Sequence, residues 1–448
     1  MVSRGAPRSW AQPGCGTMEI VRIAWFSPVP PDRSGIAAYT AELIPLLAPQ
    51  VGAIDLYHAD RHDFVWRHRR EPYDLIVYQL GNSASHDFMW AYLFRYPGLL
   101  VLHDAQVHQA RALWLLQRVE PRLDDYLAEL AANHPDAPPH LGYLFAAGLG
   151  GQLFRHWPLV ALTIRASKLT IVHNAHLARH LARDQPDATI RHVEMGVADP
   201  QPSLHDGQQV RRLLGITADT CLIGAFGGIT PEKRIPELLE AVAASPRQNV
   251  HVLLVGPRAA HYDVDADVTR LALGTRVHIA GYVDEAELPG HLAASDVCWC
   301  LRWPSHGETS ASWLRCLGAG RPTLITALAQ LEDVPALRVN AGGVASISTT
   351  VDAVGIAIDP VDERRDISHA LAACADDPTL RDTLGKNARA RWERLHTLSR
   401  MAASYVSVIA DAAARPAPAT PQPAHLLDDG TGTARRLLGE MGMPELPW

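Results

Sequence analysis

A strand–turn–helix–strand pattern over 296–326, DVCWCLRWPSHGETSASWLRCLGAGRPTLIT, most strongly constrains the fold of this chain. It predicts an apolar strand over 297–301, a turn containing Pro and Gly, a helix over 309–317 that stops at Gly residues, and a second strand over 322–326. Such units build α/β proteins, whose ligands bind outside the carboxyl ends of parallel strands.

Glu308 lies in the turn where the first strand ends and the helix begins. The unpaired N–H groups of Thr309, Ser310 and Ala311 would point at the same place and favour an anion such as a diphosphate. A carboxylate beside a phosphate site is useful when it accepts hydrogen bonds from hydroxyl groups, which suggests a nucleotide sugar. A purely helix-capping role for Glu308 explains the same residue without a ligand, and both interpretations stay open.

Length and composition limit what kind of protein this chain can be. The 448 residues predict two domains, and 47% hydrophobic with 20% charged residues is typical of globular cores. A net charge of -7 argues against general nucleic-acid binding. None of the 6 cysteines lies in a C-x-x-C pair, which indicates buried reduced thiols in a cytosolic protein. No apolar run reaches the length of about 18 residues that a transmembrane helix needs.

The first half alternates strands with helices and therefore predicts a parallel sheet. Its strands are expected at 19–27, 54–57, 74–79, 99–103, 168–173 and 189–194, with mostly helical sequence over 105–165. In the loop SPVPPDRSG after the first strand, Ser34 and Gly35 would let the backbone approach a phosphate or sugar, although a plain strand-to-helix turn is the alternative. The dinucleotide fingerprint G-x-G-x-x-G is absent from this loop.

The strand over 99–103 ends on His103, again at a carboxyl end. His103 is well placed for a substrate pocket, and Asp104 could orient its ring. His108, one helical turn further on, could share the pocket. A structural histidine at the end of a strand is the alternative.

The second half starts a new sheet, with strands expected at 221–226, 250–255, 277–280 and 296–301. In GGITPEKRI, Thr230 should cap a helix that begins at Pro231. Lys233 and Arg234 then lie in the first turn, where the helix dipole disfavours cations unless an anion joins them. Both are therefore predicted diphosphate ligands, with solvated surface residues as the alternative.

Flanking segments complete the expected organisation. We expect a disordered extension over 1–17 before a start at Met18, and a Pro/Ala-rich, extended tail. The expected parts are 18–195, the N-terminal domain; 196–204, a linker; 205–392, the C-terminal domain; 393–414, a crossover helix; and 415–448, the tail.

A basic run could contact a membrane surface peripherally, with a solvated loop as the alternative. It consists of Arg61, Arg67, Arg69 and Arg70, interleaved with Phe64 and Trp66.

Several motifs in order resemble the retaining glycosyltransferases of family 4, which have the GT-B architecture. They are SGIAAYT (34–40), YQLGN (78–82), LLVLHD (99–104), IVHN (171–174), FGGITPEKRI (226–235), HIAGYVDEAEL (278–288) and the segment 295–326, in a variant with GETSAS in place of the usual two-glutamate motif. The resemblance covers most of 19–410.

The resemblance implies two Rossmann-like domains facing across a cleft, with the last helix crossing back to the N-terminal domain. The C-terminal domain would bind the donor nucleotide and the N-terminal domain the acceptor. Lys233 matches the family's diphosphate-binding lysine, Glu308 its sugar-contacting glutamate and His103 the histidine facing the donor sugar. Gly35 matches the glycine-loop position.

Two departures from the family pattern concern the nucleotide. Gly228 stands where the family usually has an arginine, and Arg234 could supply that charge. Arg315 replaces the second glutamate, one residue short of its usual interval from Glu308. Because arginine cannot accept hydrogen bonds from ribose hydroxyls, the nucleoside must be held otherwise.

The sequence thus predicts a cytosolic retaining glycosyltransferase that works without metal or cofactor and could dock at the inner membrane surface. It would move a sugar from a UDP- or GDP-linked donor to an acceptor hydroxyl on a glycan, a lipid-linked sugar or a small molecule. Expected catalytic residues are His103, Glu308 and Lys233. The expected donor-binding residues are Gly35, Gly228, Lys233, Arg234, Glu308, Thr309 and Ser310. Alternatives are a sugar-nucleotide epimerase, a phosphorylase, or a non-catalytic binding module of the same fold.

Overall fold

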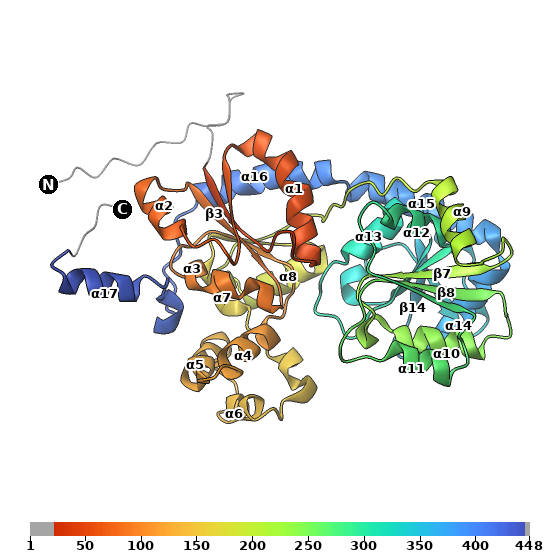
Figure 1. The fold of residues 1–448 in the computed structure, drawn as a ribbon, viewed down its shortest axis with the longest axis horizontal. Helices are drawn as coiled ribbons and strands as arrows, with labels where there is room; N and C mark the ends of the chain where they lie inside the picture. The colour runs from red at the N-terminus through yellow and green to blue at the C-terminus, as the bar shows by residue number, and fades with distance from the viewer. Residues whose placement is uncertain (1–21, 444–448) are drawn as a thin grey trace.

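The computed structural model describes residues 22–443, which form two α/β domains side by side (Figure 1). The predicted extension over 1–17 and the start at Met18 lie outside the described residues. Each domain is built on its own mainly parallel sheet, as the strand–helix alternation predicts.

A six-stranded parallel sheet in the order β2-β1-β3-β4-β5-β6 forms the centre of the N-terminal domain. Its strands are β1 (Ile23–Phe26), β2 (Ile54–Tyr57), β3 (Leu75–Leu80), β4 (Leu99–Leu102), β5 (Leu169–Val172) and β6 (Ile190–His192). The central strands are buried along their whole length because helices cover both faces of the sheet. The covering elements include α1 (Gly35–Val51), α2 (Phe64–Arg70), η1 (Ala84–Met89), α3 (Trp90–Leu93), α7 (Ala161–Ala166) and α8 (Ala175–Asp184).

A helical subdomain is inserted between β4 and β5 and projects away from the sheet (Figure 1). It consists of α4 (His108–Leu116), α5 (Leu123–Asn133), α6 (Leu141–Ala146) and η2 (Gly151–His156). A buried ion pair between Arg111 and Glu129 joins α4 to α5. The mostly helical character predicted for 105–165 is confirmed.

The C-terminal domain has an eight-stranded sheet in the order β13-β12-β14-β11-β10-β7-β8-β9. Its strands are β7 (Cys221–Phe226), β8 (Val250–Val255), β9 (Val277–Gly281), β10 (Val297–Cys300), β11 (Thr323–Thr326), β12 (Leu337–Asn340), β13 (Gly343–Val344) and β14 (Gly355–Ile358). The β12–β13 pair is antiparallel and the others are parallel. The helices are α9 (Leu204–Leu213), α10 (Ile235–Ala244), α11 (Val264–Arg270), α12 (Leu288–Ala294), α13 (Ala311–Gly318), α14 (Glu363–Asp376) and α15 (Pro378–Leu395).

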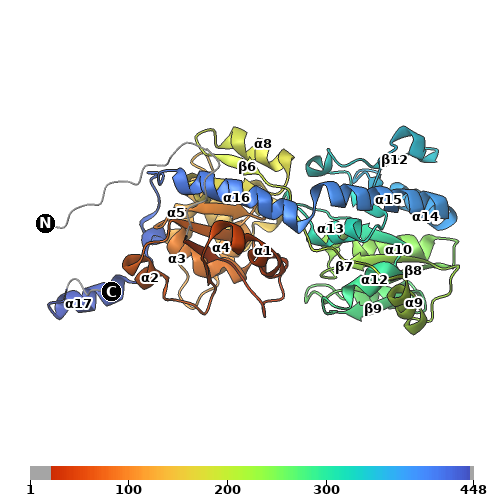
Figure 2. The ribbon, with the colours of Figure 1, turned by 90° about the horizontal axis from the view of Figure 1, so that it is seen from above.

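The helix α16 (Leu398–Ala414) crosses from the C-terminal domain back onto the N-terminal domain (Figure 2). Its Tyr405 is fully buried, and the hydroxyls of Tyr405 and Tyr39 on α1 are 2.6 Å apart. The fold class expected from the sequence, including the returning helix, is therefore confirmed.

The tail differs from the extended segment expected from its composition. Residues 415–431 pack against the N-terminal domain. There Leu426 of η6 (Ala424–Leu427) is only 3% exposed. His425 Nε2 lies 2.8 Å from Glu129 Oε1, and its Nδ1 lies 3.1 Å from Asp125 Oδ1. A single apolar anchor flanked by polar contacts docks a segment whose composition alone indicates no fixed structure. The chain then forms α17 (Gly432–Glu440).

Candidate functional site

A cavity of about 600 Å³ separates the two domains. The loop 30–35 and the start of α1 form its N-terminal wall, and the loops after β7, β8 and β9 with α13 form its C-terminal wall. Gly35 and Gly228, both predicted from the sequence, line it. This volume at the carboxyl ends of strands from two facing sheets suits a small-molecule ligand.

Bare backbone forms the cavity wall where β7 and β8 end. Gly227 has a φ of 95° and Gly256 a φ of 149°, which side chains rarely adopt. A Cβ on Gly256 would lie 2.1 Å from the carbonyl oxygen of Gly227, and a Cβ on Gly227 would lie 2.2 Å from Lys233 Nζ. Glycine is required here, and it leaves the backbone open to a ligand.

The ammonium group of Lys233 lies beside this glycine turn. Its Nζ donates a hydrogen bond to the carbonyl oxygen of Phe226 at 2.6 Å. Burial, followed by the positive charge of Arg302, lowers the pKa of Lys233 to about 8. Since no carboxylate among residues 22–443 forms an ion pair with Lys233, an anion in the adjoining cavity would stabilise its charged form.

Arg234 is not brought to the cavity, which differs from its predicted role beside a diphosphate. The predicted helix start is instead a short 3₁₀ turn, Pro231–Lys233, without a side-chain cap from Thr230, and Arg234 has a left-handed φ of 57°. This conformation turns its guanidinium to Glu363 on α14 and to Glu237, which is 2.7 Å away. Two carboxylates thus already neutralise Arg234.

Glu308 lies in a smaller, separate cavity of about 40 Å³. Its carboxylate is ion-paired with Arg302 and accepts hydrogen bonds from Ser305 Oγ at 3.0 Å and from the N–H of His306 at 2.7 Å. Burial alone would raise the pKa of Glu308, but Arg302 and the backbone hydrogen bonds to its carboxylate together hold it below its usual value. Glu308 is therefore ionised at neutral pH.

The helix after Glu308 begins later than predicted. Ser310 is the N-cap, accepting a hydrogen bond from the N–H of Trp313 at 3.3 Å, and α13 starts at Ala311. Thr309 precedes the helix, and its hydroxyl donates to the carbonyl oxygen of His173 at 2.9 Å. Thr309 and Ser310 line the Glu308 cavity, but Thr309 also serves the contact between the domains.

The turn around Glu308 docks on the N-terminal domain beyond β4 and β5. Asn174 Nδ2 donates to the carbonyl oxygen of Gly307 at 2.7 Å. The N–H of Ala105 donates to the carbonyl oxygen of His306 at 3.3 Å. The turn that carries Glu308 thus faces the strand ends of the N-terminal domain.

His103 lies at one of those strand ends. Its Nε2 is hydrogen-bonded to Gln79 Oε1, and its ring centroid is 5.0 Å from that of Tyr39 and 5.2 Å from that of His173. Burial, followed by the neighbouring imidazoles, lowers the pKa of His103 well below its usual value. His103 is therefore a neutral residue beneath the interface and does not line the 600 Å³ cavity.

The predicted helpers of His103 lie elsewhere. Asp104 does not orient its ring, since Asp104 Oδ2 instead accepts a hydrogen bond from the N–H of Asn82 at 2.9 Å. Burial raises the pKa of Asp104 to about 6. His108 belongs to the helical subdomain, where its Nε2 is 2.6 Å from the hydroxyl of Tyr126.

Sequence reasoning missed Arg302 as a site residue and did not foresee the contacts of Arg315. Arg302 binds Glu308 and lowers the pKa of Lys233, so its charge influences both predicted residues. Arg315 lines the large cavity and forms an ion pair with Glu42 of α1. Neither the Arg302–Glu308 pair nor the Arg315–Glu42 pair follows from local sequence. The only available signal was the position of Arg302 in the turn that also contains Glu308.

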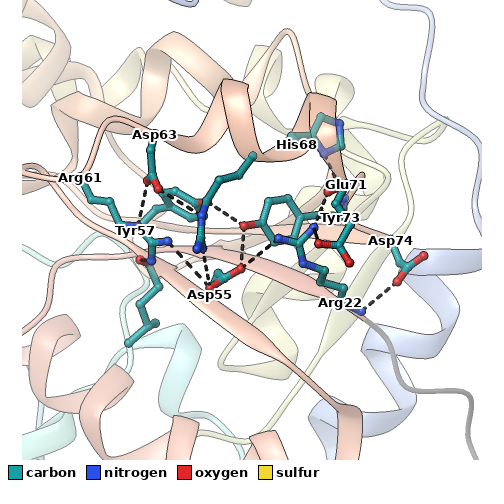
Figure 3. Close-up of polar contacts among 11 residues, drawn as sticks. Arg22, Asp55, Tyr57, Arg61, Asp63, His68, Glu71, Tyr73 and Asp74 are labelled. Atoms are coloured by element: carbon teal, nitrogen blue, oxygen red, sulfur yellow. Dashed lines mark hydrogen bonds and ion pairs between the residues drawn. The ribbon is translucent and has the colours of Figure 1, made fainter. Parts of the chain in front are cut away.

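Two members of the basic run, Arg61 and Arg67, belong to an ion-pair network around Asp55, which Figure 3 shows with Arg22 and Arg61 labelled. Arg67 Nη1 lies 3.0 Å from Asp55 Oδ1, and Arg61 Nε lies 2.9 Å from Asp63 Oδ1. Phe64 is fully buried. Most of the run lies in the helix α2 rather than in the loop given as the alternative, and membrane contact stays a prediction.

Residues 22–443 offer neither a metal centre nor a membrane span. No group of three or more His, Cys, Asp or Glu side chains in this range is arranged to hold a metal ion. No helix in the same range has the length and apolar character needed to cross a bilayer.

The chain is similar to several solved structures. Sucrose-phosphate synthase from Thermosynechococcus elongatus superposes with a TM-score of 0.62 at 17% identity, covering 87% of this chain and 98% of that protein. Anabaena Alr3699/HepE, solved in complex with UDP, gives 0.55 at 16% identity, covering 87% and 99%. WaaG, a glycosyltransferase involved in lipopolysaccharide biosynthesis, gives 0.56 at 15% identity, covering 87% and 99%.

No protein-family model matches the sequence, and no curated protein sequence matches it. The chain has the GT-B fold. That conclusion rests on the two facing domains, the returning helix and structural neighbours that cover nearly the whole described chain.

Proposed function

We propose that the protein transfers a sugar from a nucleotide-diphosphate sugar to an acceptor hydroxyl. The observation that carries this proposal is the cavity between the domains, whose wall is bare glycine backbone at Gly227 and Gly228. The uncompensated ammonium of Lys233 does not itself line the cavity but lies next to Gly227. The fold supports it, because neighbours of the same architecture were solved with UDP and with UDP-glucose. Fold alone does not determine activity, so the proposal rests on the residues of the site.

The diphosphate would lie against the glycine turn at Gly227 and Gly228. There Lys233 would exchange its bond to a backbone carbonyl for a charge-assisted bond to phosphate oxygen. During transfer, negative charge grows on the leaving diphosphate. A pre-positioned ammonium in a buried site stabilises that charge at little reorganisation cost.

The sugar would lie towards Glu308, at the junction with the N-terminal domain. The ionised carboxylate can accept hydrogen bonds from sugar hydroxyls and so fix the anomeric carbon. Arg302 binds Glu308, and its charge also acts on Lys233, so it would add positive charge near the anionic ligand. His103, neutral and half-buried, would shape the acceptor side without acting as a base.

We further propose that transfer retains the anomeric configuration and needs no metal. The cationic groups of this site, Lys233 and Arg302, would supply the charge that a metal supplies elsewhere. Product stereochemistry and activity in EDTA test these two points separately.

The first experiment is a thermal-shift panel of UDP, GDP, ADP, TDP and their common sugar conjugates. A ligand at 100 times its Kd adds about 2.7 kcal/mol of stability, which is readable as a shift. We expect one nucleotide to stand out, with the shift lost in Lys233→Ala and kept in Lys386→Ala. Release of the nucleoside diphosphate dependent on an acceptor then establishes transfer. If no nucleotide shifts the melting temperature of the folded wild-type protein, the proposal is contradicted. Nucleotide binding without turnover would indicate a binding module.

A further inference from the structure

A second cavity, of about 330 Å³, lies on the C-terminal domain at the opposite end of its sheet. Residues that precede β10 and β11 form one wall, and the first turns of α15 form the other. None of its lining residues lines the cavity between the domains. The two cavities are therefore separate places on the molecule.

Charged side chains dominate the lining of this cavity. They are Arg321, Arg381, Lys386 and Arg389, with Asp296 and Asp382.

Several of these charges are already compensated. Lys386 Nζ lies 2.6 Å from Asp382 Oδ2, and Arg389 Nη1 lies 2.7 Å from Asp199 Oδ1. Asp296 is in turn paired with Arg211 at 3.0 Å.

Arg321 and Arg381 have no carboxylate partner among residues 22–443. Arg321 Nη1 donates to the carbonyl oxygen of Ser295 at 3.1 Å, and Arg381 Nη1 donates to the carbonyl oxygens of Cys374 and Ala375. The Nε of Arg321 is buried and has no hydrogen-bond partner in the described chain. A buried donor without an acceptor is costly, so the Arg321 guanidinium is not fully satisfied by the described chain.

The uncompensated charge does not reflect an excess of basic residues. The chain has 48 acidic against 41 basic residues, so carboxylates outnumber the cations available to pair with them. Two guanidiniums that line one cavity and have no carboxylate partner in the described chain are therefore a local feature of this site, whose own carboxylates, Asp296 and Asp382, are already paired with Arg211 and Lys386.

We propose that this cavity binds the phosphate dianion of a phosphorylated small molecule. Two guanidiniums balance the two negative charges of a phosphate monoester, and their planar forks suit phosphate oxygens. A volume of 330 Å³ leaves room for an organic group beyond the phosphate. The site lies just past the C-terminal end of α13. Two residues within this helix, Ser312 and Arg315, line the cavity between the domains. A bound ligand would thus lie beside Gly320 and Arg321, in the segment that leaves this helix.

Isothermal titration of the full chain with inorganic phosphate, at constant ionic strength and saturating UDP, tests the site. UDP occupies the proposed donor site, so phosphate is left with the second cavity. We expect saturable binding that weakens about tenfold or more in Arg381→Gln and in Arg321→Gln. Lys386→Gln, at an exposed position, should also weaken binding because it leaves Asp382 uncompensated. Arg364→Gln, a change at a 94% exposed arginine on α14, is the matched control and should bind normally.

The Lys233→Ala variant separates this proposal from the proposed function. Phosphate binding that persists in Lys233→Ala and is lost in Arg381→Gln supports the second site, whatever the fate of sugar transfer. Binding that is lost in Lys233→Ala and unchanged in Arg381→Gln would place the phosphate between the domains and overturn the proposal. Absence of saturable binding in the wild-type protein would also overturn it. Should Arg381→Gln fail to fold, Lys386→Gln distinguishes the same two outcomes.

A repeat titration with glycerol 3-phosphate, and sedimentation with phosphatidylcholine vesicles with and without phosphatidic acid, identify the source of the phosphate. Tighter binding of glycerol 3-phosphate than of inorganic phosphate supports a soluble ligand. Sedimentation only with phosphatidic acid, lost in Arg381→Gln, would replace the soluble ligand by a lipid headgroup.

Discussion

Arg315 on α13 is ion-paired with Glu42 on α1, so a single charge pair joins the two walls of the large cavity. The side chains are 15% and 20% exposed, which makes the pair largely desolvated. Arg315 also lies 3.4 Å from Glu285. Arg315 stands where the sequence resemblance led us to expect a glutamate, and it instead joins one domain to the other.

A double-mutant cycle measures this contact. We expect Arg315→Gln and Glu42→Gln each to lower the urea midpoint, because each leaves a partly buried charge without its partner. The double variant should lose less free energy of unfolding than the two single variants together, with a coupling energy of about 1–2 kcal/mol. Additive losses would show that Arg315 relies on Glu285 instead.

Lys233 should give nucleotide binding a characteristic dependence on pH. The free protein holds Lys233 protonated below its pKa of about 8 and loses that charge above it. Affinity for UDP should therefore be constant from pH 7 to just below 8 and fall above it. Titrations at several pH values test this, and the fall should be absent from the weaker binding of Lys233→Ala.

The same pKa predicts that the stability of the unliganded protein rises with pH, whereas its affinity for UDP falls. Because the folded pKa is below the unfolded value near 10.5, the buried ammonium penalises the folded state below about pH 8. The penalty is relieved as pH rises from 8 to 10.5. Lys233→Met should thus stabilise the unliganded protein at pH 7 by up to about 2 kcal/mol, allowing for residual exposure, and by little at pH 10.5. A constant difference across this range would contradict the assignment.

Arg234 shows where prediction from sequence stops. The strand, glycine turn and basic pair around Lys233 are local, so the position of Lys233 beside bare backbone could be predicted. The direction of Arg234 depends on its left-handed φ and on Glu363, which is 129 residues away. Sequence adjacency to Lys233 therefore suggested a shared ligand that the backbone does not allow.

Side-chain pairings within each domain were hidden for the same reason. His103 was expected at a strand end and lies there, but its partner Gln79 comes from the neighbouring strand. The Arg302 pairing with Glu308 required the turn to fold back on itself. The two sheets follow from strand–helix alternation, whereas these pairings depend on how the elements pack.

The left-handed conformation of Arg234 predicts a difference between two substitutions. Arg234→Gly and Arg234→Ala both remove the ion pairs to Glu363 and Glu237. Only alanine retains the steric cost of a positive φ, so it should be less stable than glycine by about 1 kcal/mol. Urea denaturation of both variants measures this difference. Equal stability would mean that the turn relaxes to a negative φ once the ion pairs are lost.

The docked tail predicts a contrast between adjacent leucines. Leu426 is 3% exposed in the core of the N-terminal domain, whereas Leu427 is 38% exposed. Leu426→Ala should lower the free energy that holds the tail in place by about 2–3 kcal/mol, and Leu427→Ala by well under 1 kcal/mol. We expect the tail to detach without unfolding the sheets, because it contributes no strand to either sheet. The loss should therefore appear as faster proteolytic cleavage within 415–431 rather than as a lower global midpoint. Equal cleavage rates in the two variants would show that the polar contacts of His425, rather than the burial of Leu426, anchor the segment.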